Sequence, residues 1–369
     1  MPNTVMQTQL TLPKLMSEHY STASNRSEIV FAYDAVDANP NGNPLSGANR
    51  PRIDPQTNQA IVTDVRLKRY LRDQLQDDGH GVYIRNVNEE GFQATREDLL
   101  EARLKDLELE DVDVDEIEEA VFRQFLENSA DVRYFGATMS IDMDEEKYGD
   151  VAEQLPDHFT GPVQFSPGKS LHPVTVNEEY NSLTSVIATG EGKQQGGFDL
   201  DDHRIQYAFI GFHGLVDEHG AEDTLLTDED VRRLDMLCWR ALKNQTISRS
   251  KVGQEPRLYL RVEYDGESFH LGGLDRDLAL DTEASEPAEE LRTVRDVCID
   301  VTSLVDRLEN ASDRIDTVHI VASDVLDVSI DGDIGDHEFL YEELRNAVGA
   351  DSVRVVDVYE DAQATMPEE

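Results

Sequence analysis

The sequence predicts an α+β protein, and three observations support this class. Residues 27–36, 204–212 and 257–265 are apolar throughout or alternate in side-chain character, as β-strands do. Residues 64–76 and 227–242 instead carry apolar side chains three and four positions apart, the spacing of helices with one buried face. These elements follow one another as strand, helix, long insertion, strand, helix and strand. That order predicts one sheet covered by helices.

A turn-rich segment joins the first strand to the first helix. Residues 27–36 are largely apolar on both faces, which predicts a central strand. Residues 37–44 concentrate Asp, Asn, Gly and Pro, and Arg50 is expected to be extended because it precedes a proline. Thr63 or Asp64 then caps the helix. The buried stripe of this helix is expected to consist of Leu67, Tyr70, Leu71 and Leu75.

Residues 78–202 are expected to be insertions between the two halves of the fold. Residues 95–128 are acidic with helical periodicity and break near 111–115, which predicts two helices. Residues 165–198 are rich in Gly, Ser, Thr, Asn and Gln, which predicts a long mobile hairpin or loop. Residues 1–26 are polar and weakly patterned, so we expect an N-terminal extension.

The second half repeats the strand and helix pattern. Thr227 opens a helix with three acidic residues in its first turn. The strand at 257–265 has two distinct faces. One face carries Leu258, Leu260, Val262 and Tyr264, and the other carries Arg257, Tyr259, Arg261 and Glu263. We expect the first face to pack on two helices and the second face, with Tyr259, to be open.

The C-terminal region adds further elements after a polar, acidic stretch. Residues 275–293 are expected to be a linker or excursion, followed by a strand near 317–322. A helix near 337–348 should stop at Gly349, with a last strand at 353–358. The whole order suggests a split β-α-β plait, the plan shared by ferredoxin-like and RNA-recognition-motif folds.

The charge of the chain points to an unusual solvent. Its 77 Asp and Glu against 33 Lys and Arg give a formal net charge of −44, and the acid is spread along the chain. Because 38% of the residues are hydrophobic and periodically placed, we expect a folded protein rather than a disordered one. At about 1 M ionic strength the Debye length is about 3 Å. The surface is therefore typical of a halophilic protein, which dilute buffer would destabilise.

Several functional classes are not expected. Cys238 and Cys298 are far apart and lack metal-ligand spacing, so they are expected to be reduced core residues of a cytoplasmic protein. The chain has no run of 18 apolar residues that would predict a membrane span. It also lacks the charged and apolar N-terminal pattern of a signal peptide.

Two basic islands stand out against the acidic background. Residues 50–72 contain six Lys or Arg against two Asp, and residues 240–262 contain six against one Glu. In a chain whose usual surface residue is acidic, clustered cations indicate an anionic ligand. Diffuse attraction to nucleic acid weakens steeply in salt. The ligand must then be held by close contacts from arginines, amides and backbone N–H groups.

The islands supply most of the candidate contacts for nucleic acid. The first island and the turn before it supply Asn41, Asn43, Arg50, Arg52, Arg66, Lys68 and Arg69. Those elsewhere are Lys169, Arg249, Ser250, Lys251 and Tyr259. Forked guanidinium groups, amides and hydroxyls suit phosphate. For the turn at 39–44 with Arg50 and Arg52, the alternative is an ordinary polar loop. For the cations of the helix at 64–76 it is a solvated helix face, and for residues 248–254 it is a solvated loop.

Catalytic and metal sites are weakly indicated. Carboxylates that a metal-dependent nuclease could use are Asp34, Asp37, Asp54 and Asp64, but acid is so common here that they carry little information. The histidines His172, His203 and His213 lack zinc-ligand spacing and are expected in the core or in hydrogen bonds. Gly168, Lys169 and Ser170 lack the first glycine of a phosphate-binding Walker loop, since position 163 is Val163. We expect no catalytic residue, metal or cofactor.

Several segments together resemble one known family. Residues 33–44, 50–54 and 62–69 resemble the start of the CRISPR backbone subunits of the Cas7 group. Residues 202–207 and 246–254 resemble later segments of the same group. The resemblance is closest to the type I-B branch, often called Csh-two. It is specific in the combination of motifs rather than in any single one.

This resemblance implies a palm of the RNA-recognition-motif (ferredoxin-like) kind, with a helical insertion as fingers and a long hairpin or loop as thumb. It implies copies that polymerise along one CRISPR RNA (crRNA) in a helical filament. Type I members bind RNA without catalysis, whereas type III relatives cut target RNA with a loop aspartate. The implied partners are crRNA, target DNA through the guide, further copies of the chain, and the Cas-five-type, Cas-six-type, large and small Cascade subunits.

The resemblance also implies a division of the chain and the place of some contacts. The palm-helix cations of the family fall on Arg66 and Arg69, with Lys68 nearby. The expected divisions are an extension (1–26), a first palm segment (27–84), helical fingers (85–160), a thumb-like loop (161–202), a second palm segment (203–275) and a C-terminal α/β segment of the palm (276–369).

We therefore expect a non-catalytic, crRNA-binding backbone subunit of a type I-B Cascade complex. Its cations would hold the guide phosphates and leave the bases free to pair with target DNA. One alternative is a metal-dependent, RNA-guided ribonuclease of the type III kind that uses Asp34 or Asp37. Another is a halophilic scaffold with no role in binding nucleic acid.

Overall fold

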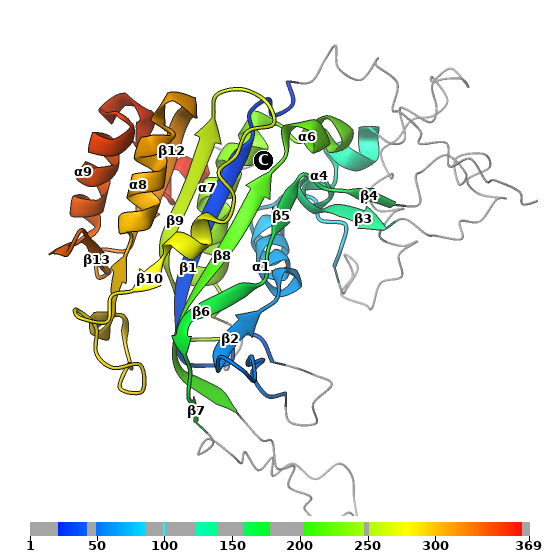
Figure 1. Cartoon of the computed structure of the whole chain (residues 1–369). Coiled ribbons are helices and arrows are strands. Elements are labelled where there is room, and N and C mark those ends of the chain that lie inside the picture. The colour runs from blue at the N-terminus through cyan, green and yellow to red at the C-terminus, as the bar shows by residue number, and fades with distance from the viewer. Residues whose placement is uncertain are drawn as a thin grey trace, which may run out of the picture.

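A nine-stranded sheet organises the chain, with helices on both faces (Figure 1). The computed structural model describes residues 21–42, 49–85, 99, 123–138, 158–177, 203–246 and 251–363. The strands of the sheet are β1 (Ser27–Ala38), β2 (Gln59–Val62), β5 (Val163–Phe165), β6 (Gly168–Pro173), β7 (Val176–Asn177), β8 (Arg204–Val216), β9 (Gln254–Tyr264), β12 (Ile315–Ala322) and β15 (Val353–Val355). The predicted α+β class is correct.

Strand β1 lies at the centre of this sheet, as its two apolar faces predicted. The path through the sheet is β15-β12-β9-β1-β8-β6-β2, and β5 and β7 also pair with β8. β1 is antiparallel to β8, with Ser27 opposite Val216, and antiparallel to β9, with Ser27 opposite Glu263. β6 is antiparallel to β8. Nearly every side chain of β1 is buried, because both of its faces are covered.

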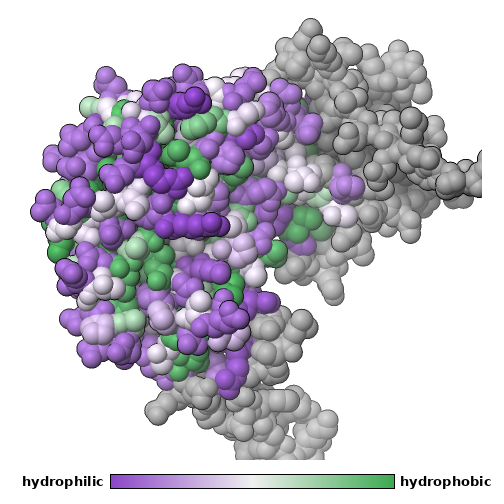
Figure 2. Space-filling model, viewed as in Figure 1, coloured by the Kyte–Doolittle hydropathy of each residue, from purple (hydrophilic) through white to green (hydrophobic). Residues whose placement is uncertain are grey.

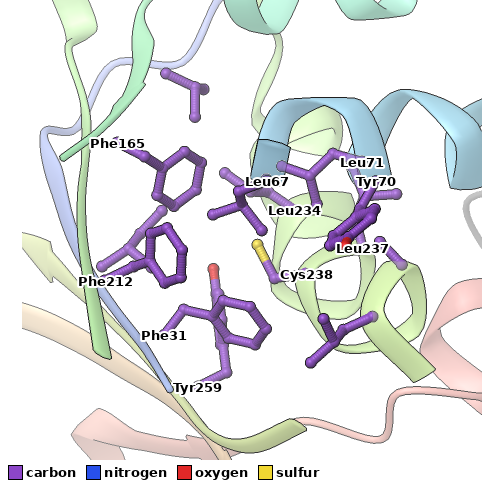
Figure 3. Close-up of a cluster of buried hydrophobic side chains, with 14 of the residues drawn as sticks. Phe31, Leu67, Tyr70, Leu71, Phe165, Phe212, Leu234, Leu237, Cys238 and Tyr259 are labelled. Carbon is purple, nitrogen blue, oxygen red and sulfur yellow. The ribbon is translucent and has the colours of Figure 1, made fainter. Parts of the chain in front are cut away.

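Helices α1 (Asp64–Asp77) and α7 (Asp228–Lys243) cover one face of the sheet. Thr63, rather than Asp64, caps α1, because its side chain accepts a hydrogen bond from the backbone N–H of Arg66. α7 begins with a capping box between Thr227 and Asp230. Figure 3 shows the resulting core, whose labelled residues are Phe31, Leu67, Tyr70, Leu71, Phe165, Phe212, Leu234, Leu237, Cys238 and Tyr259.

The opposite face is covered by the C-terminal region of the chain, with α8 (Thr302–Asn310) and α9 (His337–Val348) on the side away from α7 (Figure 1). The apolar face of β9 packs there, against Leu304, Leu308, Leu340 and Leu344. A second sheet has the order β10-β11-β13-β14. Its strands are β10 (Ala279–Leu280), β11 (Cys298–Asp300), β13 (Asp327–Ile330) and β14 (Asp333–Gly335).

The expectation that Tyr259 stands on an open face is wrong. Tyr259 is 0% exposed, and its hydroxyl donates to Asp235 of α7 over 2.9 Å. Arg261 on the same face is 1% exposed and donates to both carboxylate oxygens of Asp235, at 2.6 and 2.9 Å. Alternation along a strand separates two faces, but it does not say which element covers each. Here α7 supplies the buried carboxylate that allows polar side chains to face the core.

Two further sequence-based expectations need correction. Residues 275–293 are no linker, since Leu278 and Leu291 are buried and tie this excursion to the core beneath α8. The beginning of the predicted loop at 165–198 consists of β6 and β7, which pair in the main sheet. Gly168 permits this packing, because a Cβ there would lie 2.4 Å from the ring of Phe212. Residues 178–202 lie outside the described residues.

Several short elements complete the description. They are α4 (Ala130–Phe135), β3 (Gly136–Thr138), β4 (His158–Thr160), α6 (Glu218–Thr224), the 3-10 turns at Leu274–Asp277, Val294–Asp296, Ser312–Arg314 and Ala350–Ser352, and α10 (Glu360–Gln363). The predicted C-terminal helix is confirmed as α9, which ends before Gly349 at φ 101°. β15 is shorter than predicted. Val356 still donates its N–H to the carbonyl of Ile320, and Val356 and Val358 pack on Met236 of α7.

The surface, the two cysteines and His172 agree with the expectations from the sequence. Figure 2 shows a mostly hydrophilic surface over the described residues on this side of the molecule. Cys238 and Cys298 are both buried and free. His172 is a core residue as expected, since its Nδ1 bonds to the carbonyl of Pro173 and its Nε2 accepts from the N–H of Phe209. Within the described residues, no helix is both long and apolar enough to cross a bilayer.

The buried pair of Asp235 and Arg261 gives a prediction about stability. Asp235→Ala should lower the free energy of unfolding by about 3–5 kcal/mol, because it removes the two-oxygen partner of a buried guanidinium and leaves, among the described residues, only the carboxylate contact with Glu263 at 3.0 Å. Asp73→Ala is the matched control, since it removes an exposed partner 2.8 Å from Arg69 and should cost less than about 1 kcal/mol. Urea unfolding in molar KCl measures both. Equal losses would contradict a structural role for the buried pair.

Candidate nucleic-acid interface

The turn after β1 is tied to the beginning of α1 by Asn41. The side-chain oxygen of Asn41 accepts hydrogen bonds from the backbone N–H and the hydroxyl of Thr63, at 2.8 and 2.9 Å. The carbonyl of Asn41 accepts from the N–H of Arg52 over 3.3 Å. Asn41 is 4% exposed. It was expected to offer amide donors to a ligand, but its burial gives it a structural role in placing Arg52 and the first turn of α1.

Arg52 and Arg66 lie beside this turn, and Lys169 lies on β6, the neighbour of β2. Among the described residues, no Asp or Glu oxygen lies within the 4.0 Å of an ion pair from any of the three. The guanidinium of Arg66 lies 5.8 Å from the centre of the Tyr70 ring. Arg52 has a buried Nε atom with no hydrogen-bond acceptor. Lys169 is exposed on β6, opposite Ile61 of the neighbouring strand β2.

Lys251 reaches the same turn from the start of β9. It is 9% exposed, and its ammonium donates to the backbone carbonyl of Asn39. Burial, and then the charge of Arg66, lower the pKa of Lys251 to about 7. This loop, which was expected to contact phosphate with a solvated loop as the alternative, thus places an inward-facing cation next to a second cation. Arg50 is exposed at the other side of the turn.

The remaining cations of the first island are engaged by the protein itself. Lys68 donates to the side-chain oxygen of Gln164 over 2.8 Å, and Asp64 lies 3.6 Å away. Arg69 forms an ion pair with Asp73 at 2.8 Å, one helical turn further along α1. Beyond these, Arg72 pairs with the fully buried Asp131 at 3.0 Å. Arg66 thus differs from its helical neighbours in having no acidic partner within the described residues.

Most cations of the second island also have internal partners. These pairs are Arg240 with Asp78 at 2.7 Å, Lys243 with Glu255, Arg257 with Asp34 at 2.9 Å, and Arg261 with Asp235 at 2.6 Å. They join α7 and β9 to their neighbours. The clustering that the sequence attributed to an anionic ligand therefore reflects, to a large extent, buried carboxylates of the chain itself.

Three of the candidate contacts lie outside the described residues. They are Asn43, Arg249 and Ser250. Tyr259, in contrast, is described and fully buried, so it has no surface to offer to a ligand. Among the described residues, the structure brings Arg52, Arg66 and Lys251 to the end of the molecule formed by the turn, β2 and the start of α1. Lys169 follows Gly168, which faces Phe212 and the core under α1, so its side chain leaves β6 on the opposite face.

The carboxylates considered for catalysis are not arranged as a metal site. Asp34 is 0% exposed, and both of its oxygens accept from Arg257, at 2.9 and 3.2 Å. Burial raises the pKa of Asp34 to about 6, although Arg257 opposes that rise. Asp37 adopts a φ of 44°, and its carbonyl accepts from Arg204. No group of three potential metal ligands occurs within the described ranges.

Two apolar residues next to the cations were missed by the sequence analysis. Val65 is 68% exposed beside Arg66, and Val252 is 55% exposed beside Lys251. Val65 lies off the apolar stripe of α1, which was a signal available in the sequence. An apolar surface next to phosphate-binding groups can contact riboses or bases without depending on charge. Such contacts keep their strength in concentrated salt.

Gly253 determines where Lys251 is placed, and this gives a second prediction. Gly253 has a φ of 105°, and a Cβ there would lie 2.3 Å from the carbonyl oxygen of Val36. Gly253→Ala should therefore destabilise the fold by roughly 1–3 kcal/mol and displace the turn that carries Lys251. Urea unfolding in molar KCl measures the loss.

Gly266 is the matched control for this substitution. It has a φ of 94°, but no atom lies within 4 Å of the position that a Cβ would take. Gly266→Ala should cost only the backbone strain of about 1–2 kcal/mol. A larger loss at Gly266 than at Gly253 would contradict the steric argument.

Comparisons with known proteins agree on one family. The family model described as "CRISPR-associated protein Cas7" matches residues 25–302. A protein of that name from Haloferax volcanii is 54% identical over 330 residues, which cover 88% of this chain and 93% of the relative.

Two solved structures are also similar to this chain. A chain of a "CRISPR RNA-guided surveillance complex, pre-nicking" gives a TM-score of 0.48 at 13% identity, over 92% of this chain and 99% of that one. A chain of a "CRISPR RNA-guided surveillance complex" gives 0.40 at 13% identity, over 80% and 88%. On the family match and the sequence identity, the chain belongs to the CRISPR-associated protein Cas7 family.

Proposed function

We propose that this chain is the non-catalytic, crRNA-binding backbone subunit of a type I-B Cascade complex. One observation carries the proposal beyond family membership. Within the described residues, the islands' cations that lack an acidic partner gather at the turn after β1, whereas the others form internal ion pairs. The members of this cationic end are Arg52, Arg66 and Lys251.

A sugar–phosphate chain is the ligand that this cationic end fits best. The net charge of −44 repels any polyanion at long range, but molar salt reduces that repulsion to distances of a few ångströms. Close contacts from arginine forks and ammonium groups can then hold individual phosphates. Phosphate contacts carry no sequence information. This suits a guide, whose sequence must be free to vary.

The sheet order supports a palm of the RNA-recognition-motif kind. The antiparallel order β9-β1-β8-β6, with α1 after β1 and α7 after β8, consists of two interleaved β-α-β units. We assign these elements to the palm, residues 85–160 to the fingers, 178–202 to the thumb, and the C-terminal region to a cover of the second sheet face. Because both faces of the sheet are then covered, the guide would bind at the edges of the palm rather than on its sheet.

The proposed partners follow from this role. Copies of the chain would assemble head to tail along one crRNA, because heterologous contacts that do not close generate an open helix. Target DNA would bind through pairing with the guide. The other Cascade subunits, of the Cas-five, Cas-six, large and small types, would occupy the ends and the side of the filament.

Assembly on RNA tests the proposal directly. Purified protein mixed with crRNA of increasing length in molar KCl should form complexes whose copy number grows with RNA length. Analytical ultracentrifugation or native mass spectrometry measures that number. One fixed stoichiometry for all lengths, or no bound RNA, would overturn the proposal and favour a scaffold role.

Substitution of the unpaired arginines gives a third prediction. Arg66→Ala combined with Arg52→Ala should weaken RNA binding by at least tenfold, about 1.4 kcal/mol, and to the same extent for unrelated sequences. The reason is that two phosphate contacts are lost without loss of base contacts. Fluorescence anisotropy with labelled RNA of several sequences measures the affinity.

Arg232→Ala provides a matched control. Arg232 is an exposed arginine near the start of α7 that forms no ion pair among the described residues, and α7 places it far from Lys251. Its loss removes one positive charge, as each of the two substitutions does, and should leave the affinity nearly unchanged. An equal loss in the control would mean that overall charge, rather than this end of the molecule, governs binding.

The type III ribonuclease alternative has no feature of the described residues in its favour. Asp34 is buried and bound by Arg257, so its carboxylate is not available at the surface. Incubation of assembled protein with complementary labelled RNA and Mg²⁺ should leave that RNA intact. Regularly spaced cuts that disappear in Asp34→Ala or Asp37→Ala would establish the ribonuclease instead.

A further inference from the structure

Lys251 is unusual among the buried cations of the described residues. Three cationic side chains are buried there: Arg233, Arg261 and Lys251. Arg233 pairs with Asp230 at 2.5 Å, and Arg261 pairs with an aspartate at 2.6 Å. Lys251 has only the backbone carbonyl of Asn39 as an acceptor, and no carboxylate within ion-pair distance among the described residues. A buried ammonium without an anion destabilises the folded protein, so an anionic ligand bound at this position would stabilise it.

The positive charge of Arg66 makes the charged form of Lys251 still less favourable. Arg66, also without an acidic partner in the described residues, is the charged group that acts on Lys251. Two like charges at a partly desolvated position favour loss of a proton from the more acidic of the two groups, which is the ammonium of Lys251. In agreement, burial and Arg66 lower the pKa of Lys251 to about 7. The RNA-free protein therefore holds this lysine largely neutral above neutral pH.

Among the described residues, two tyrosines and one glutamate are the other titratable groups around this pair. Tyr33 of β1 and Tyr70 of α1 lie close to Arg66, and burial raises the pKa of both, so they are neutral. Glu255 at the start of β9 is bound by a lysine of α7. Within the described residues of this cluster, Lys251 is the group whose pKa is brought to about 7.

We propose that Lys251 and Arg66 form a binding site for one backbone phosphate of the guide, and that Lys251 takes up a proton when the phosphate binds. This inference rests on the proposed function of guide binding. The phosphate supplies the negative charge that the pair lacks and thereby stabilises the ammonium form. The proton comes from the solvent, a new N–H bond forms on Nζ, and no other bond changes.

Proton uptake makes the affinity for RNA depend on pH with a defined sign. The pKa of Lys251 is lower in the free protein than in the complex, so the complex binds more protons. The association constant is then highest below pH 7 and falls as the pH rises, by up to about tenfold for each unit. Phosphate contacts from arginines alone would give no such dependence, because guanidinium groups keep their charge.

Binding measurements on four proteins test the inference. A labelled RNA short enough to hold one copy is titrated in molar KCl between about pH 6 and pH 8.5, and the wild type should weaken by roughly 30-fold. Lys251→Met should bind weakly with no pH dependence, and Lys251→Arg should also show none while binding more tightly than Lys251→Met. Lys243→Met, which removes an exposed lysine paired with Glu255, should match the wild type.

Calorimetry measures proton uptake on binding, which would be absent if Lys251 had only a structural role. At about pH 8, binding enthalpies in two buffers of different ionisation enthalpy should show uptake of close to one proton per bound wild-type copy. Lys251→Arg should show none. Circular dichroism confirms that each variant is folded, and if Lys251→Met fails to fold, the wild type and Lys251→Arg decide the question.

The outcomes separate this inference from the proposed function. A wild-type protein that binds RNA with a flat pH profile and no proton uptake would overturn the inference while guide binding stands. A pH dependence that survives in Lys251→Arg would also overturn it, because another group would be titrating. Failure to bind RNA at any pH would instead overturn the proposed function.

Discussion

Internal pairing of charge is the constraint on which the rest of this structure depends. Buried carboxylates at Asp131, Asp230 and Asp235 each hold an arginine: the first two pairs tie α4 to α1 and to α7, and the third ties α7 to β9 of the sheet. Removal of one partner from such a buried pair typically lowers the free energy of unfolding by about 3–5 kcal/mol. The cations that the core requires are thereby removed from the surface. Among the described cations of the two islands, those left for a ligand form a small set around one turn, which includes Arg66 and Lys251.

This division fits a strongly acidic protein. A surface that carries a net charge of −44 cannot attract a polyanion at long range, and concentrated salt would screen such attraction in any case. Recognition must then come from short-range contacts, which depend on where each group is fixed. Asn41 and Thr63 fix the turn to α1, and Gly253 allows the approach that brings Lys251 to Asn39. Placement, rather than total charge, is what these residues provide.

The sequence predicted the elements better than their environment. The central strand, the two helices on its first face and helix α9 could be predicted, because apolar periodicity and capping residues are local signals. The role of Tyr259 could not, because the alternation along β9 is the same whichever face α7 covers. The partners of Arg69 and Arg72 also differ in kind: Asp73 is one turn away and readable, whereas Asp131 is 59 positions away and is brought close only by folding.

A map of the protein bound to a short guide RNA in molar KCl, obtained by electron cryomicroscopy, tests the central claim most directly. The account predicts a backbone phosphate in contact with both the Arg66 guanidinium and the Lys251 ammonium, with the pair of Arg72 and Asp131 intact. RNA held instead on the flank of α1 by Lys68 and Arg69, with Lys251 still bound only to Asn39, would contradict it.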